Sequence, residues 1–211
     1  MSFKRNKYKV VKGAISKELS SFVYSYFLKK RQVGHFLLNQ KYISPFTESW
    51  GVWTDPQAPN TYSVYGDTVM ETLLEALKVK MEKETDYKLN ETYSYARIYK
   101  RGDVLHRHKD RDSCEVSATL NLGGDPWTIY LDPTGKTGQA GIPVDLEPGD
   151  MLLYSGCDLE HWREEFRGKD CAQVFFHYND VTTEKGKKNK FDSRPFLGLP
   201  AWFKKSITRT E

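Results

Sequence analysis

A series of short apolar segments separated by turn residues fills the second half of this 211-residue chain and constrains its fold more than any other feature. From Tyr93 onward the segments have the length and residue types of β-strands, and turns such as Pro148-Gly149 divide them. Strands are predicted at residues 93–99, 115–122, 127–131, 144–146, 151–154, 160–162 and 172–178. Short strands at this spacing are typical of a β-sandwich or a jelly roll.

Helical patterns precede the strands. A strand at 8–11 leads to Ser16, a candidate N-cap. After it the apolar residues recur at helical spacing and predict one buried stripe. The residues of this stripe are Phe22, Val23, Tyr26 and Phe27.

A second helix is predicted after Asp67, which is a candidate N-cap, and it extends to about Glu84. Its apolar positions are Val69, Leu73, Leu74, Leu77, Val79 and Met81. The predicted class is therefore α+β with a mainly β core, in which the N-terminal helices pack on one sheet.

We expect one domain over residues 1–211. Residues 1–92 form a supporting region of helices and loops, 93–180 form the β core, and 181–211 form a tail that packs back through apolar residues. The last group comprises Phe196, Leu197, Leu199, Trp202 and Phe203.

The composition indicates a cytoplasmic globular protein. No apolar run of about 18 residues is present, so a transmembrane helix is excluded, and the basic N-terminus lacks the apolar region of a secretory signal. Three cysteines without CxxC spacing disfavour a disulfide framework. The net charge is only +4, and the lysines of 185–190 are expected in a solvated loop, which disfavours a nucleic-acid partner.

Two overlapping pairs of potential metal ligands lie in one hexapeptide. His106 with His108, and His108 with Asp110, are each two residues apart and would share one side of a strand. His161 supplies a later histidine. Two imidazoles alone would suit zinc or copper, whereas two imidazoles and a carboxylate form a facial triad suited to Fe(II). Such a triad leaves three metal positions open for a co-substrate and dioxygen.

The surroundings of these residues resemble a known family. Tyr99-Lys100-Arg101-Gly102 followed by His108-Lys109-Asp110 is similar to the pattern Y-x-x-G-x-x-x-x-x-H-x-D. Pro148-Gly149-Asp150, without the usual spacer between Pro and Gly, precedes Glu160-His161-Trp162 as it does in that family. Over roughly residues 93–180 the chain resembles the Fe(II)- and 2-oxoglutarate-dependent dioxygenases of the prolyl 4-hydroxylase-like type.

This resemblance implies a double-stranded β-helix (jelly roll) with His108, Asp110 and His161 as the metal ligands and catalytic centre. His106 then lies outside the ligand set. The implied cofactors are Fe(II), 2-oxoglutarate as co-substrate and O2, with ascorbate as an optional addition. The implied reaction releases succinate and CO2 and hydroxylates a prolyl residue, an amino acid or a small molecule.

The chain departs from the family pattern at the cation that should anchor 2-oxoglutarate. The family places Arg or Lys nine to twelve residues after His161, and residues 170–173 contain neither. Lys169 is one residue short of that window, and Arg163 would share a strand face with His161. Arg167 is a weaker candidate. An Arg would offer a bidentate fork and a Lys only a point charge.

The resemblance also implies that the hydroxyls of Thr119 and Tyr99 help to hold this carboxylate. For Trp127, Trp162 and His177, packing in the core explains the residue type at least as well as substrate binding. Residues 50–62 are expected to cover the pocket mouth, and the substrate is expected to be a small molecule or a peptide.

Two alternative functions remain. A cupin-like metal-binding isomerase or binding module would need no cation for 2-oxoglutarate. A nucleic-acid repair dioxygenase would need an Arg-rich pattern after His161, where Arg163 and Arg167 lack the expected spacing.

Overall fold

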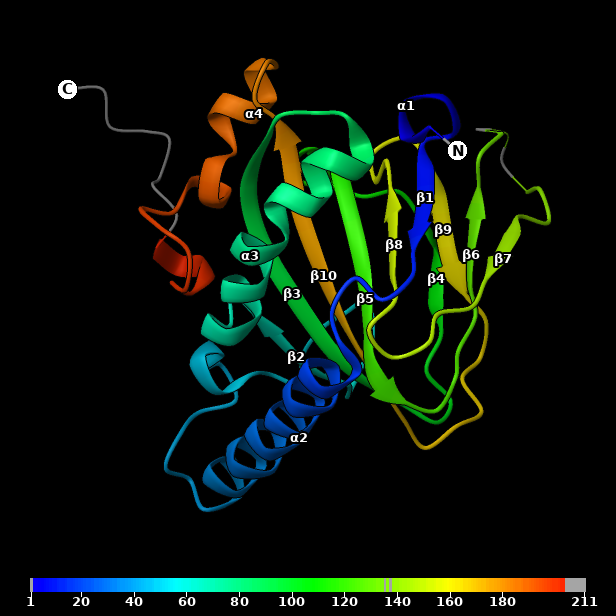
Figure 1. Cartoon of the computed structure of the whole chain (residues 1–211). Coiled ribbons are helices and arrows are strands. Elements are labelled where there is room, and N and C mark those ends of the chain that lie inside the picture. Colours follow the sequence, from blue (N-terminus) through cyan, green and yellow to red (C-terminus); the bar gives the residue numbers. More distant parts are fainter. Residues whose placement is uncertain (1, 135, 137, 204–211) are drawn as a thin grey trace.

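Two antiparallel β-sheets face each other, and helices cover the outer face of the larger one (Figure 1). The computed structural model describes residues 2–203 except 135 and 137. The larger sheet has the order β1-β8-β5-β10-β3-β2 and the smaller one the order β4-β9-β6-β7. The strands are β1 (Tyr8–Val11), β2 (Tyr62–Tyr65), β3 (Leu89–Lys100), β4 (Leu105–His108), β5 (Val116–Gly124), β6 (Ile129–Asp132), β7 (Ile142–Val144), β8 (Met151–Tyr154), β9 (Glu160–Arg163) and β10 (Asp170–Asp180).

Without the edge strands β1 and β2, each sheet has four strands, and the chain passes repeatedly from one sheet to the other. This arrangement is that of a jelly roll. The helices are α1 (Phe3–Asn6), α2 (Lys17–Asn39), α3 (Thr68–Thr85) and α4 (Glu184–Lys188). Short 3-10 helices occupy Glu48–Trp50, Asp112–Cys114, Lys190–Ser193 and Ala201–Phe203.

Both long helices begin where their capping residues predict. The Ser16 hydroxyl accepts a hydrogen bond from the backbone of Leu19 at 3.2 Å, and the Asp67 carboxylate accepts from Val69 and Met70 at 3.0 Å and 3.1 Å. These bonds satisfy amide groups that a helix start leaves without partners. The predicted starts of α2 and α3 are therefore confirmed.

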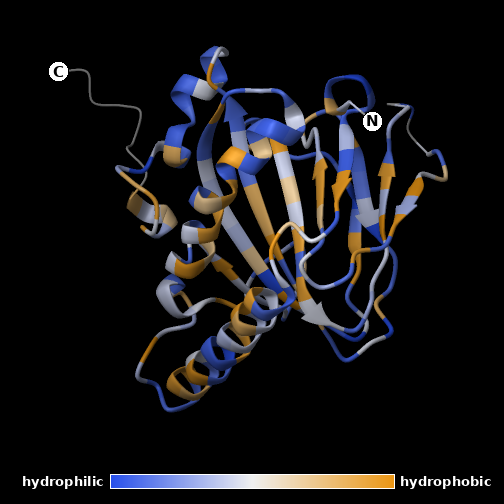
Figure 2. Ribbon diagram, viewed as in Figure 1, coloured by the Kyte–Doolittle hydropathy of each residue, from blue (hydrophilic) through white to orange (hydrophobic). Residues whose placement is uncertain are grey.

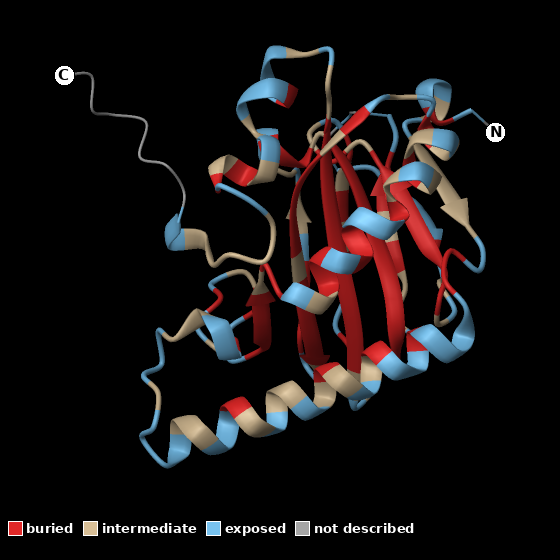
Figure 3. Ribbon diagram, turned by 60° about the vertical axis from the view of Figure 1, so that its left-hand side comes forward, coloured by how far each residue is buried: buried red, intermediate tan, exposed pale blue. Residues whose placement is uncertain are grey.

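Each helix presents a narrower apolar stripe to the sheet than the sequence suggested. Val23 and Phe27 are fully buried, but Phe22 is 68% exposed, and on α3 Val79 is 76% exposed. Adjacent helix residues differ by about 100° in direction, so the neighbour of a buried residue can face solvent. Figure 2 shows the mixed hydropathy of both helices, and Figure 3 shows the blue outer sides of their ribbons against the red sheet.

Alternation along the central strands separates the two sides of the larger sheet. On β10, Ala172, Val174 and Phe176 belong to the core under the helices. Gln173 and His177, at the odd positions, project to the other side, between the sheets. The even face therefore stabilises the fold, and the odd face is available for a site.

Two strands were not predicted, and two further expectations need correction. β2 fell within or beside a segment interpreted as a loop, and β4 lacked its own apolar run. The lysine run at 185–190 contains the exposed helix α4 instead of a loop, because Thr183 caps the amide of Gly186 at 2.9 Å. In the tail, Leu197 packs on the core, whereas Phe196 and Trp202 are 59% and 68% exposed. Residues 204–211 of the tail lie outside the described part of the chain.

Among the helices that the structure describes, we find none with the length and apolar character needed to cross a bilayer.

Candidate metal centre

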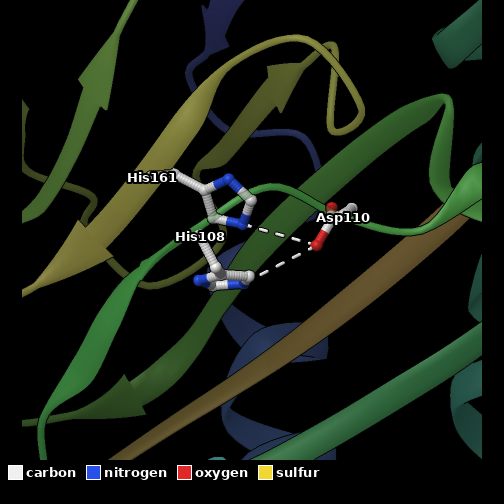
Figure 4. A group of neighbouring side chains, drawn as sticks. All are labelled: His108, Asp110 and His161. Atoms are coloured by element: carbon white, nitrogen blue, oxygen red, sulfur yellow. Dashed lines mark ion pairs between the residues drawn. The ribbon is translucent and has the colours of Figure 1, made fainter. Parts of the chain in front are cut away.

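Three potential metal ligands converge at one end of the smaller sheet. His108 ends β4, Asp110 follows two residues later, and His161 on β9 lies opposite His108 in the strand register. The Nε2 atoms of His108 and His161 lie 3.7 Å and 3.5 Å from Oδ1 of Asp110. Figure 4 shows the three side chains directed toward one point. Ligand atoms about 2.1 Å from an octahedral ion lie about 3 Å apart, so this set fits one face of such an ion.

Backbone carbonyls orient both imidazole rings. Nδ1 of His108 lies 2.7 Å from the carbonyl oxygen of His106, and Nδ1 of His161 lies 3.1 Å from that of Leu159. Donation from Nδ1–H places the lone pair on Nε2, the atom that faces Asp110. Burial, and then the neighbouring His161, lower the pKa of His108. His108 is therefore held neutral, as a metal ligand must be.

Asp110 is held as a carboxylate by its surroundings. Burial alone would raise its pKa, but the interaction with His161, and then with His177 and His108, more than reverses this and holds the pKa well below its usual range. Oδ2 accepts from the Ser117 hydroxyl at 3.0 Å, and the Asp110 amide donates to the Gly156 carbonyl at 2.9 Å. A β-carbon on Gly156 would lie 2.4 Å from Oδ2 and 2.7 Å from Oγ of Ser117. Only glycine leaves room for the carboxylate here.

A second potential ligand cluster shares Asp110 with the first. Asp110, Cys114 and His177 also bring their ligand atoms within 4.8 Å of one another. Burial, however, raises the pKa of the Cys114 thiol well above its ordinary value, and a protonated thiol is a poor ligand. Burial also lowers the pKa of His177 to about 4, and its Nδ1 lies 2.9 Å from the Ser117 hydroxyl. His177 therefore supports Asp110 through Ser117.

A cavity of about 240 Å³ opens in front of the triad. Its walls carry aromatic rings and charged groups from the larger sheet and from the loop before β2. The wall residues besides the triad include Asp55, Tyr93, Tyr95, Arg97, Phe175 and His177. His106, in contrast, is exposed, and only its backbone contributes to the site.

Arg163 is buried on β9 next to Leu105, a residue of the cavity wall, and most of its donors are unused. It is two residues beyond His161 and 1% exposed, and it pairs in register with Leu105, which lines the cavity. Its Nη1 donates to the carbonyl oxygen of Trp127, and its guanidinium carbon lies 5.0 Å from the Trp127 ring centroid. Nε and Nη2 are buried and have no hydrogen-bond partner among the described residues. Burial lowers the pKa of Arg163 from its ordinary value.

Arg97, which the sequence analysis missed, lies in the cavity wall with its donors used. Nε and Nη2 donate to Asp55 at 2.8 Å and 2.5 Å, Nη2 also donates to Gln57 at 2.6 Å, and Nη1 donates to the Tyr99 hydroxyl at 3.1 Å. The alternation of 93–99 could have revealed it, because Arg97 and Tyr99 share one face of β3.

The remaining predicted carboxylate-binding residues lie in different places. Lys169 is exposed, and its amide donates to Asp125. Arg167 is also exposed. Thr119 is fully buried and donates to Gln173 at 3.3 Å. Tyr99 is fully buried and lies near enough to Arg163 to interact with it electrostatically. The structure thus brings Arg163 and Tyr99 together but leaves Lys169 apart.

Comparison with known proteins identifies the fold. No protein-family model matches the chain, and no curated protein matches it in sequence. Among solved structures, a prolyl-4-hydroxylase from Pseudomonas putida is 14% identical with a TM-score of 0.59, over 84% of this chain and 95% of that one. HygX from Streptomyces hygroscopicus, with nickel and 2-oxoglutarate bound, is 15% identical with a TM-score of 0.59, over 85% of each chain.

EctD from S. alaskensis, solved with 2-oxoglutarate and 5-hydroxyectoine, is 14% identical with a TM-score of 0.63, over 97% of this chain and 82% of that one. At such identities the likeness concerns the fold. The predicted fold class is confirmed: the chain has the double-stranded β-helix fold that these 2-oxoglutarate-dependent enzymes share.

Proposed function

We propose that this protein is an Fe(II)- and 2-oxoglutarate-dependent dioxygenase that hydroxylates a prolyl residue, an amino acid or another small molecule. The observation that carries the proposal is the convergence of His108, Asp110 and His161 on one point beside a cavity. Two neutral imidazoles and one carboxylate on a single face are the donor set of non-haem Fe(II) oxygenases. The fold shared with enzymes of this kind supports it.

In this proposal the protein residues hold and orient the reactants. His108, Asp110 and His161 bind the iron, while Ser117 and two backbone carbonyls fix their directions. When bound, Fe(II), 2-oxoglutarate and O2 supply an oxidative decarboxylation that yields succinate and CO2 and adds one oxygen atom to the substrate. The ring of Phe175 and the Tyr93 and Tyr95 rings would keep bulk water from the reacting atoms.

Arg163 is the proposed anchor for the distal carboxylate of 2-oxoglutarate. A buried guanidinium with unpaired N–H groups is costly, and an entering carboxylate would satisfy Nε and Nη2 together. In the proposal Tyr99, whose ring contacts Trp127 as Arg163 does, adds its hydroxyl. Thr119 stays a weaker part of the proposal because its hydroxyl already bonds Gln173. These open donors also speak against the cupin-like alternative, which has no use for a cation at this point.

A cytoplasmic site of action stays part of the proposal. The three cysteines, all of them described, are free thiols, as in proteins of reducing compartments.

Anaerobic titration tests this function. Protein loaded with Fe(II) should develop a visible metal-to-ligand absorption band when 2-oxoglutarate is added, and it should release succinate when air is admitted. His108→Ala should abolish the band, whereas the exposed His106→Ala should retain it. Iron-loaded wild-type protein that gives neither the band nor succinate would exclude the proposal.

A further inference from the structure

A second cavity, of about 340 Å³, adjoins the metal cavity. The two share Tyr93 and Tyr95 as walls, and consecutive residues face them: Asp110 lines the first and Arg111 the second. The second cavity therefore begins within one residue of the proposed metal carboxylate. Together the two volumes fall in the range of small-molecule sites.

The arginines around this second cavity are neutralised by carboxylates. Arg111 bonds both oxygens of Asp192, at 3.1 Å and 2.8 Å. Arg97, which stacks on Tyr95, pairs with Asp55. Each positive charge beside the shared tyrosines thus has its own counter-ion.

Arg194 follows the same rule. Its guanidinium carbon lies 4.8 Å from the centroid of the Tyr65 ring, and it pairs with Glu71 at 2.7 Å in a fully buried contact. The arginine contacts therefore contribute no net charge to the second cavity.

Glu48 is the exception to this balance. It lines the second cavity, its Oε2 is buried, and that oxygen has no hydrogen-bond partner among the described residues. No cation of the described chain lies within salt-bridge distance of it. A buried carboxylate oxygen without a partner favours the arrival of a positively charged donor.

The aromatic walls suit the same kind of group. Tyr65 and Tyr93 are stacked, with ring centroids 5.0 Å apart and planes 23° apart, and Tyr95 completes the wall. Arginines already lie over these rings: Arg194 is 4.8 Å from Tyr65, Arg111 is 4.6 Å from Tyr93 and Arg97 is 4.9 Å from Tyr95. The rings therefore offer an entering ligand an apolar surface for the methylene groups next to an ammonium or guanidinium ion.

We propose that the second cavity is the substrate subsite and that it accepts a protonated amine or a guanidinium group, with Glu48 as the residue that determines this specificity. The inference rests on the proposed function and names its substrate class: a compound with a cationic end at Glu48 and a reacting carbon near the metal.

Matched ligand pairs test the inference. L-Arginine with L-citrulline, and L-lysine with L-norleucine, differ in charge but little in size. Each is added anaerobically to the Fe(II)- and 2-oxoglutarate-loaded protein, and perturbation of the absorption band gives its Kd. At least one cationic member should bind about tenfold or more tightly than its neutral partner, because Glu48 would otherwise be left unpaired.

Variants locate the effect. Glu48→Gln should remove the preference while keeping the 2-oxoglutarate band, Glu48→Asp should retain part of it, and Glu184→Gln, at an exposed glutamate, should leave it unchanged. Equal binding of both members of each pair, no binding by any member, or a preference that survives in Glu48→Gln would overturn the inference. Failure of the proposed function would appear earlier, as a missing band before any amine is added.

Discussion

Two arginines are buried in the interior of this protein to almost the same degree, and they differ in what surrounds them. Arg97 is 5% exposed and uses its donors on Asp55, Gln57 and Tyr99. Arg163 is 1% exposed and has one protein acceptor, the carbonyl oxygen of Trp127.

The difference separates two uses of a buried charge. A guanidinium in which every nitrogen has a protein partner connects elements of the fold; here Arg97 links β3 to the loop that carries Asp55. A buried guanidinium with unpaired N–H groups is unfavourable, and a ligand that accepts hydrogen bonds from them can stabilise it. Burial alone therefore does not distinguish Arg97, which stabilises the cavity wall, from Arg163, which is proposed to bind the co-substrate.

The largest effect is expected from Arg97→Met. This change leaves Asp55 buried without its counter-ion, and breaking such a pair costs about 3–5 kcal/mol. Urea unfolding should show this loss of stability, and Arg97→Met combined with Asp55→Asn should recover part of it. A loss of less than about 1 kcal/mol would mean that Arg97 is no more important to the fold than a surface charge.

Arg163→Met should weaken 2-oxoglutarate binding without lowering stability, the opposite of Arg97→Met. Loss of charged hydrogen bonds worth about 2–3 kcal/mol should weaken 2-oxoglutarate binding about a hundredfold. Stability should stay the same or rise, because a buried, unpaired charge has been removed. Anaerobic titration of the absorption band and urea unfolding measure the two quantities. Arg163→Lys should bind with intermediate affinity, and unchanged affinity in Arg163→Met would rule out Arg163 as the anchor.

The pH dependence of stability should sharpen the comparison further. Burial alone would raise the pKa of Asp55, but the Arg97 charge and hydrogen bonds from Tyr95 and Gln57 lower it below its ordinary value of 3.8. Its contribution in the wild type is therefore complete above that value and is lost only as the pH falls further, through the lowered pKa.

In Arg97→Met, burial should prevail and raise the pKa of Asp55. Protonation of Asp55 at lower pH would then remove the buried charge. The difference in free energy of unfolding between wild type and variant should therefore shrink by about 1 kcal/mol between pH 7 and pH 5. Urea midpoints at pH 7, 6 and 5 provide the measurement. With Asp55→Asn added, the deficit should no longer vary with pH; a variation that persists would assign it to another group.

The smallest effect is expected from Lys169→Met. Lys169 is exposed and apart from the cavity, so its removal should change 2-oxoglutarate affinity by less than about twofold. This variant is the matched control for Arg163→Met in the same titration. A large loss here would assign the anchor to Lys169, the other candidate from the sequence.

Local chemistry made much of the fold predictable. Ser16 and Asp67 cap their helices through short-range bonds that a sequence can reveal. The strand predicted at 172–178 falls within β10 because its residues alternate or run apolar over a sufficient length. β2 could not be found in the same way, since its four residues form a strand only by pairing with the distant β3.

The candidate site was likewise predictable in part: its ligands could be predicted, and most of the residues around them could not. The resemblance to the dioxygenase motif implied His108, Asp110 and His161, which the structure brings together. Alternation along β9 predicts that Arg163 faces the interior with His161, as it does. The direction of Lys169 depends on the turn between β9 and β10, which spacing does not determine. Glu48 begins a short 3-10 helix, and Asp55 lies in the loop after it. Tertiary contacts set the position of both, so no local sequence pattern indicates them.

Gly156 has a consequence for judging related chains. The Asp110 carboxylate occupies space that any β-carbon at position 156 would take, and the carbonyl oxygen of Gly156 accepts the amide hydrogen of Asp110. A chain with alanine here would still carry both histidines and the aspartate, yet their arrangement would be displaced. A count of the ligand residues alone would score such a chain as having an intact site, and the added methyl group would be the only sign that it does not.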